Sequence, residues 1–393
     1  MIYTNYGSNP TSDYLKMCEA NKFYSLAEWN SNLDKTTFYY DRHDQAIRRV
    51  EFRDLMTKEV CKYFLSNEDS YVYINYADDY INSVDLDRFA SDIKLRNIDN
   101  PRIIFFLMDQ NFEDFLLDGL KKRGVFNCSA ININILLHKI KPRYNKIPPS
   151  THRFSVFSRN YYPWRLSIFL ELINRGVIDN TIYSFHNYHP YDGQKEYSLD
   201  KLKKDVLKEG YELTDNIENW INRVPYDLGL KSSKFAPPTF QAIDKSDIHI
   251  IIESHFDPYL GYIYREAKPK YDPLTIAPGF LTEKTWKPIV CRKPFILLAT
   301  PYALRDLRKL GYRTFDNIID ETYDTIIDDK LRMKAVGAEV ERLNNLSKED
   351  FAELLYKLKD IVEFNYNLFL QQHKTTEDLK RRYPITKDPV VTL

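Results

Sequence analysis

Two successive series of short apolar runs alternate with stretches of helical periodicity, and this alternation constrains the fold more than any other feature. In the first series the apolar runs cover residues 2–6, 36–40, 71–76, 102–108 and 130–137. In the second series they cover residues 154–157, 181–185, 247–252 and 294–298. Strands that alternate with helices form parallel sheets covered on both faces. The sequence therefore predicts an α/β protein.

Helical periodicity fills the intervals between these runs and the last part of the chain. The predicted helices lie near residues 52–65, 85–95, 112–123, 162–175, 199–209, 217–222, 282–291, 302–310, 328–345 and 348–373. Residues 223–245, which contain Pro225, Pro237 and Pro238, are expected to form a loop. Pro288 is expected to kink the helix at 282–291 or to end it early.

A basic run without helical periodicity separates the two series. The chain has 393 residues, and domains usually hold ~100–200 residues. The run continues from His138 to Pro149 and contains three prolines, which is typical of a linker. We expect two Rossmann-like domains, at residues 1–149 and 150–345, and a C-terminal helix and tail at 346–393 that packs back on the first domain. The expected ligand site is a cleft at the carboxyl ends of the strands.

Charge and cysteine usage bound the classes of function. Lys and Arg number 56 and so do Asp and Glu, giving a net charge of zero, whereas proteins with a long electrostatic grip on DNA are usually more basic. The cysteines form no C-x-x-C pair and are expected to be buried thiols in a reducing compartment: Cys18, Cys61, Cys128 and Cys291. No signal peptide or run of ~18 apolar residues is present, so we expect a cytoplasmic protein without a membrane segment.

The segment 280–284 concentrates groups that suit a nucleotide. Glu253 lies at the end of a buried strand, and Thr282 is placed to cap a helix whose first turn holds Glu283 and Lys284. The phosphates of a nucleoside diphosphate need a cation and the N–H groups of a helix start, and its ribose needs a carboxylate. Alone, the same tripeptide is more often a capping arrangement with a solvated lysine. The return to a strand through Pro294 favours the nucleotide interpretation.

The order of three short motifs carries a resemblance to a known family. With Glu253-Ser254, Thr282-Glu283-Lys284 and Pro294-Phe295-Ile296 in this order, the chain resembles the α-1,3-fucosyltransferase type of inverting enzymes and related glycosyltransferase-like proteins of large phages. The resemblance covers roughly residues 152–345, and the first 150 residues carry no motif match. Glu253 lacks the asparagine that follows it in the family, and its distance from Glu283 in the sequence is long.

An arginine pattern adds to the resemblance. Ser158-Arg159-Asn160, followed by Arg165 at a helix start, matches the arginine that the family places after a strand. By resemblance, Glu283 binds the ribose of a donor, and Lys284 and Arg165 bind its diphosphate. The full set of donor-binding residues implied in this way is Arg159, Arg165, Glu253, Ser254, Thr282, Glu283 and Lys284.

The resemblance also implies an architecture and a reaction. The architecture is two facing Rossmann-like domains with parallel sheets (GT-B), with the donor in the interdomain cleft. The N-terminal domain is then the acceptor side, and the C-terminal domain binds the nucleotide sugar. The reaction is an inverting transfer of a hexose or pentose from a UDP- or GDP-type nucleotide sugar to an acceptor hydroxyl. The nucleotide sugar is a co-substrate, and no metal or other cofactor is essential.

The acceptor hydroxyl requires a general base, expected in the N-terminal domain. Asp13, Asp79 and Asp109 lie at or near the ends of predicted strands, and one of them is expected to serve. Each is equally explained as a turn or helix-cap residue. His186 and His189 are further candidates for the cleft or are surface residues.

Metal and acceptor remain open at this stage. Asp85-Leu86-Asp87 has the letters of a metal-dependent transferase, but it is expected to begin a helix, where aspartate is a common cap. The acceptor is either a hydroxymethylated cytosine of double-stranded phage DNA, reached by base flipping, or a glycan hydroxyl, as in a fucosyltransferase-like enzyme. Basic runs at 121–123 and 201–204 bear on the first option. A non-catalytic nucleotide- or nucleic-acid-binding protein is the alternative from another class.

Overall fold

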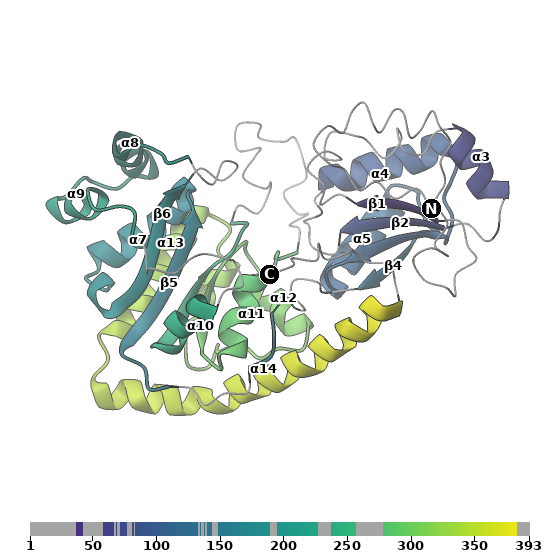
Figure 1. The fold of residues 1–393 in the computed structure, drawn as a ribbon. Helices are drawn as coiled ribbons and strands as arrows, with labels where there is room; N and C mark the ends of the chain where they lie inside the picture. Colours follow the sequence, from purple (N-terminus) through teal and green to yellow (C-terminus); the bar gives the residue numbers. More distant parts are fainter. Residues whose placement is uncertain are drawn as a thin grey trace. The chain divides into compact units, whose positions relative to one another are not determined.

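The computed structural model describes most of the chain and divides it into two units (Figure 1). The first comprises Met1–His138 with His373–Leu393, and the second comprises Lys139–Gln372. The described residues are 37–41, 58–66, 68, 71–76, 81, 83–132, 134, 137, 140–143, 148–188, 195–226, 237–256 and 278–382. Both units contain a parallel sheet with helices, so the predicted α/β class is confirmed.

The first unit has a four-stranded parallel sheet in the order β1-β2-β3-β4. Its strands are β1 (Thr37–Asp41), β2 (Tyr71–Tyr76), β3 (Ile103–Leu107) and β4 (Ser129–Asn132). Its described helices are α3 (Lys58–Ser66), α4 (Ser83–Arg96) and α5 (Gln110–Lys122). β4 ends at Asn132, before the predicted limit at residue 137, and Leu137 donates its N–H to Asn134 Oδ1.

The second unit has a parallel sheet in the order β6-β5-β7-β8. Its strands are β5 (His152–Asn160), β6 (Thr181–Tyr188), β7 (Ser246–Ile252) and β8 (Phe295–Leu298). Five consecutive residues of β7, from Ile248 to Ile252, are buried, as in a central strand covered on both faces. This explains why β7 appears in the sequence as an unbroken apolar run.

Helices cover both faces of this second sheet. The described helices of this part of the chain are α7 (Pro163–Asn174), α8 (Leu199–Glu209), α9 (Asp215–Ile221), α10 (Pro237–Asp244), α11 (Glu283–Val290), α12 (Ala303–Lys309), α13 (Asp329–Asn344) and α14 (Lys348–Arg382). Short 3-10 helices lie at η3 (Ile178–Asn180) and η5 (Thr322–Thr325). α7 packs against α13 on one face, and α10 and α11 pack against β7 on the other (Figure 1).

Two elements differ from the sequence-based expectation. Residues 237–244, expected to be loop, form α10, since Pro237 and Pro238 occupy its first turn, where a helix needs no backbone donor. α14 extends to Arg382, beyond the predicted end at residue 373. Pro288 lies inside α11, and the helix continues for two residues beyond it, to Val290. Among the described helices, none combines the length and the hydropathy needed to cross a bilayer.

Candidate functional site

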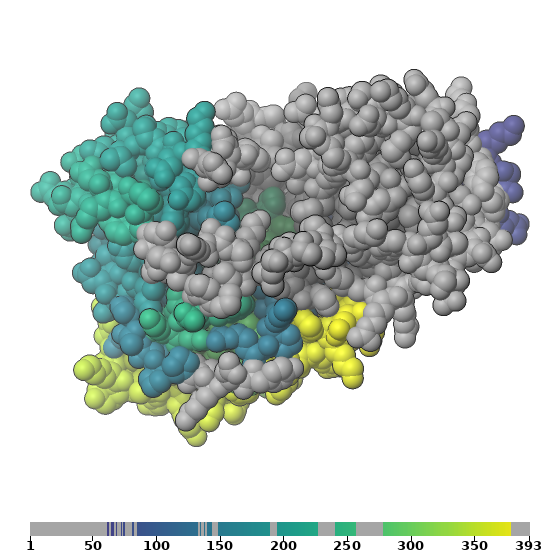
Figure 2. Space-filling model, in the orientation of Figure 1, coloured from purple at the N-terminus to yellow at the C-terminus, as the bar shows by residue number. Residues whose placement is uncertain are grey.

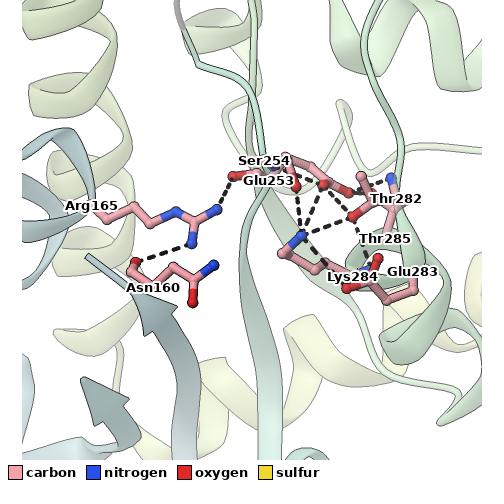
Figure 3. Close-up of polar contacts among 8 residues, drawn as sticks. All are labelled: Asn160, Arg165, Glu253, Ser254, Thr282, Glu283, Lys284 and Thr285. Atoms are coloured by element: carbon pink, nitrogen blue, oxygen red, sulfur yellow. Dashed lines mark hydrogen bonds and ion pairs between the residues drawn. The ribbon is translucent and has the colours of Figure 1, made fainter. Parts of the chain in front are cut away.

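The strand order of the second sheet reverses between β5 and β7. β6 pairs with one side of β5 and β7 with the other, so the connections that follow β5 and β7 diverge. Ligands of open α/β sheets bind outside the carboxyl ends of the strands at such a point. β5 ends at Asn160 and β7 at Ile252. The residues that follow these two ends approach each other in Figure 3, with Arg165 on one side and Glu253, Thr282 and Lys284 on the other.

Glu253 joins the end of β7 to the start of α11. It is fully buried. Its Oε1 accepts hydrogen bonds from Thr282 N at 2.9 Å and Thr285 Oγ1 at 2.6 Å. Its Oε2 accepts from Thr282 Oγ1 at 2.6 Å and Ser254 N at 3.1 Å. Because both oxygens are engaged by protein donors, Glu253 acts as a brace for α11.

Thr282 caps α11, as predicted, and Lys284 folds back over this cap. Thr282 Oγ1 accepts a hydrogen bond from Lys284 N at 3.4 Å. Lys284 Nζ donates to Ser254 Oγ at 2.9 Å and to Thr282 Oγ1 at 3.0 Å. The same ammonium lies 3.8 Å from Glu253 Oε2 and 3.7 Å from Glu283 Oε1, and 26% of its side chain is exposed. It is therefore held over the helix start and remains open to solvent.

Arg165, in the first turn of α7, is a buried cation. Its Nη1 donates to the carbonyl of Asn160 and its Nη2 to the carbonyl of Glu253, both at 3.2 Å. Its Nε has no hydrogen-bond partner among the described residues. Its guanidinium lies over the rings of Tyr162 and Trp164, at 4.9 and 5.1 Å. Burial lowers the pKa of Arg165, while the charges of Tyr162, Glu253 and Glu283 act to raise it.

Two further titratable groups lie beside these cations. His255 packs its ring edge-on against Phe280 at 5.2 Å. Burial, with the charges of Lys284 and Arg165, lowers the pKa of His255 to about 4, so its imidazole is neutral at pH 7. Lys287, one helical turn after Glu283, is 8% exposed, and its ammonium makes no hydrogen bond or ion pair with the described residues. Burial lowers its pKa to about 8.

Six of the predicted donor-binding residues come together at this point: Arg165, Glu253, Ser254, Thr282, Glu283 and Lys284. Arg159 is exposed on β5 and makes no hydrogen bond or ion pair with these described residues. The sequence reasoning missed the roles of Thr285 and Lys287. Their spacing supplies a signal, since Thr285 lies three residues after the cap Thr282, and Lys287 shares a helix face with Glu283.

The candidate bases belong to the first unit or fall outside the described residues. Asp109 is the N-cap of α5 and accepts hydrogen bonds from Asn111 N and Phe112 N. Asp13 and Asp79 lie outside the described residues, as does His189. His186 lies on β6 and stacks on Tyr188 at 4.9 Å.

The described part of the chain gives little support to a metal site or to a DNA-binding surface. There, no group of three or more His, Cys, Asp or Glu side chains has the arrangement of a metal site. Asp87, in the first turns of α4, pairs with Arg123 at 2.6 Å. The basic run 201–204 lies on α8, which forms part of the surface at the upper left of Figure 2. Two of its lysines are neutralised in part, since Lys201 pairs with Asp205 and Lys203 with Glu218.

Comparison with known proteins assigns no family to this chain. No family model matches it, and neither does any curated protein. An E. coli structure described as trehalose-6-phosphate bound with UDP-2-fluoro glucose is 12% identical, with a TM-score of 0.45, over 96% of this chain and 79% of that chain. The N-terminal domain of Candida albicans trehalose-6-phosphate phosphatase is 10% identical, with a TM-score of 0.43, over 97% and 77%.

A third solved structure has a similar degree of likeness. It is a trehalose-6-phosphate synthase studied for glycosyltransfer with retention, and it is 12% identical, with a TM-score of 0.43, over 96% of this chain and 80% of that chain. None of the three is described as a fucosyltransferase or a phage protein, so the predicted resemblance and phage origin receive no support from them.

Proposed function

We propose that this chain is a glycosyltransferase whose second unit binds a nucleotide-sugar donor. The observation that carries the proposal is the pair of cations, Arg165 and Lys284, at the point where the strand order of the second sheet reverses. A buried guanidinium without a carboxylate hydrogen bond is costly to keep, unless a ligand anion completes its hydrogen bonds. A diphosphate supplies such an anion, and arginine is suited to bind it with two parallel hydrogen bonds.

The remaining groups then have distinct roles. Arg165 and Lys284 bind the diphosphate, beside the N-terminus of α11, whose dipole favours negative charge. Glu283 accepts hydrogen bonds from the ribose hydroxyls. Ser254 and Thr282 hold the Lys284 ammonium through their hydroxyls. Glu253 holds the start of α11 at the end of β7. It does not contact the donor and acts through the residues that it positions.

For the chemistry we propose direct displacement with inversion. The acceptor oxygen attacks the anomeric carbon of the donor sugar, and the bond from that carbon to the diphosphate oxygen breaks. The acceptor proton passes to a carboxylate base of the first unit, one of Asp13, Asp79 and Asp109. Arg165 and Lys284 stabilise the negative charge that develops on the departing nucleoside diphosphate. Fixed cations of this kind typically contribute ~3–4 kcal/mol each to lowering the barrier.

We favour a glycan hydroxyl as the acceptor over a hydroxymethylated cytosine of DNA. DNA binding requires several lysines or arginines that are free to neutralise phosphates. On α8, the ion pairs of Lys201 and Lys203 reduce the positive charge that the basic run offers. Binding of modified duplex DNA with a marked salt dependence is the result that would reverse this preference.

The test is a thermal-shift panel of nucleotides and nucleotide sugars, followed by a transfer assay with the best binder. A ligand at about 100 times its Kd stabilises the folded state by ~2.7 kcal/mol. We expect UDP- or GDP-type compounds to raise the Tm and their sugars to be transferred with inverted anomeric configuration, read by proton NMR. Retained configuration contradicts the inverting step alone. Binding without any transfer indicates the non-catalytic alternative, and no response across the panel contradicts the donor site.

A further inference from the structure

Four side chains form a continuous stack that ends at Arg165. The guanidinium of Arg332, on α13, lies 4.1 Å from the ring centre of Phe256. The Phe256 ring stacks on Trp164, with centres 5.0 Å apart and planes only 10° from parallel. Arg165 then lies 5.1 Å from the Trp164 ring. We call these four residues, Arg332, Phe256, Trp164 and Arg165, the arginine–aromatic stack, and all are at least 95% buried.

Arg332 is bound to three separate segments of the second unit. Its Nη2 donates to the carbonyl of Phe256 at 2.5 Å and to Asp329 Oδ1 at 2.7 Å. Its other donors reach the carbonyls of Ala299, Ile326 and Ile327, at 3.2, 2.7 and 3.1 Å. Arg332 therefore links the backbone of Phe256 to the end of β8 and to the start of α13.

At the other end of the stack, Arg165 depends on its aromatic neighbours. Among the described residues, its hydrogen bonds go only to two backbone carbonyls, and both are long, at 3.2 Å. Contact with the faces of Trp164 and Tyr162 adds attraction for its buried charge, beside the charges of Glu253 and Glu283. Trp164 is held in turn by Phe256 on its ring. A movement of Phe256 therefore reaches Arg165 after one intervening ring.

We propose that Arg332 is a positioning residue of the donor site, which acts through Phe256 and Trp164 to hold the Arg165 guanidinium toward the donor diphosphate. This inference rests on the proposed function, because it takes Arg165 as a diphosphate ligand. Arg332 itself touches no donor. Lysine in its place keeps the charge, but it has three donors on a single nitrogen and no planar surface to lie on Phe256.

Arg153, on β5, offers a matched control within the same unit. Its guanidinium donates to the carbonyls of Leu343, Asn344 and Leu346, at 2.9, 2.7 and 2.9 Å. It also lies over an aromatic ring, that of Phe351, at 4.4 Å. Arg153 thus repeats the chemistry of Arg332 at the carboxyl end of α13, without a connection to Trp164 or Arg165.

The experiment measures the Kd of UDP and of GDP by titration calorimetry, at a temperature where circular dichroism shows every variant to be folded. We expect Arg332→Lys and Phe256→Leu each to weaken binding by about 10-fold, a loss that corresponds to ~1.4 kcal/mol and lies within the range of one cation–π contact. Arg153→Lys is expected to lower the Tm and to leave the Kd within about twofold.

A double variant separates action through Phe256 from a general loss of stability. If Arg332 acts through Phe256, the Arg332→Lys/Phe256→Leu protein binds no more weakly than Phe256→Leu alone, whereas independent effects multiply. Multiplying effects, or an unchanged Kd in Arg332→Lys, overturn the inference. If Arg332→Lys does not fold, an unchanged Kd in Phe256→Leu overturns it equally. Absence of UDP and GDP binding in the unaltered protein contradicts the proposed function itself.

Discussion

Thr282 donates its backbone N–H to one oxygen of the Glu253 carboxylate and its hydroxyl to the other, at 2.9 and 2.6 Å. These two hydrogen bonds join residues 29 positions apart and fix the cap of α11 to the end of β7. Glu283 and Lys284 therefore project from a helix start that is held in a fixed position next to the sheet. The contact between Glu253 and Thr282 therefore has a structural role that does not depend on a bound donor.

Glu253→Gln is expected to destabilise the protein by ~2–3 kcal/mol, because an amide NH₂ group faces donors where a charged acceptor stood. The free energy of unfolding in urea measures this loss. Glu283→Gln serves as the control, with a change of stability within about 1 kcal/mol and a weaker donor affinity. Equal stability losses in the two variants would show that Glu253 does not brace the helix.

Lys284→Ala is expected to lower turnover by ~100-fold or more, because it removes one of the two cations that stabilise the departing diphosphate. Steady-state sugar transfer measures the effect, with circular dichroism as the check on folding. Lys357→Ala, at a lysine of α14 that is 56% exposed and distant in sequence, is the control. Near-normal turnover in Lys284→Ala contradicts the assigned role.

Lys287→Met is expected to stabilise the protein at pH 7 and less so at high pH. The folded-state pKa of Lys287 is about 8, against an ordinary value of 10.5. Burial of its charge therefore costs about 3 kcal/mol below pH 8. This cost falls as the pH rises from 8 toward 10.5, because the folded protein then holds the neutral amine and the free energy needed to remove the proton decreases with pH.

Urea unfolding of Lys287→Met and the unaltered protein at pH 7 and pH 9.5 measures this difference. We expect the advantage of the variant to fall by about half at pH 9.5. An advantage that does not change with pH indicates a packing effect of methionine alone. If Lys287 also attracts the donor diphosphate, the more stable variant binds UDP or GDP more weakly, in the manner of a site that trades stability for function.

Gly279→Ala is expected to cost ~1–3 kcal/mol and to disturb the approach to α11. A Cβ at Gly279 would lie 2.9 Å from Ala303 Cα, a contact with backbone that only a shift relieves. Gly279 N also donates to Asp306 Oδ2 at 2.9 Å, which ties the segment before Thr282 to α12. Donor affinity and urea unfolding are both measured.

Gly210→Ala is the control for this change. Gly210 ends α8 with φ +90, so alanine there is strained by about 1 kcal/mol without crowding other backbone. We expect Gly210→Ala to lower stability and to leave the donor Kd unchanged. A donor Kd that Gly279→Ala also leaves unchanged contradicts the role of this segment in placing α11.

The sequence predicts those parts of the fold that local patterns determine. β2, β7 and α8 follow from apolar runs and helical periodicity, and the cap at Thr282 follows from its side chain and the helix after it. The sequence does not predict α10, because its two prolines are compatible both with a loop and with a first helical turn. The end of α14 at Arg382 gave no local signal either.

The site is less accessible to sequence reasoning, because its key contacts join distant segments. Arg165 was identified through a family pattern and not through its own neighbours, and its burial against Trp164 depends on packing. The saturation of Glu253 depends on Thr282 and Thr285, which come near only when α11 packs on β7. The contact of Arg332 with Phe256, 76 residues apart, is of the same kind.

The central claim is that the buried guanidinium of Arg165 binds the diphosphate of a nucleotide-sugar donor. Titration calorimetry of the unaltered protein and Arg165→Met, with a nucleoside diphosphate and with the corresponding nucleoside, tests it most directly. We expect the unaltered protein to prefer the diphosphate, and Arg165→Met to lose ~100-fold in diphosphate affinity with little change toward the nucleoside. An equal preference for the diphosphate in both proteins would contradict the account.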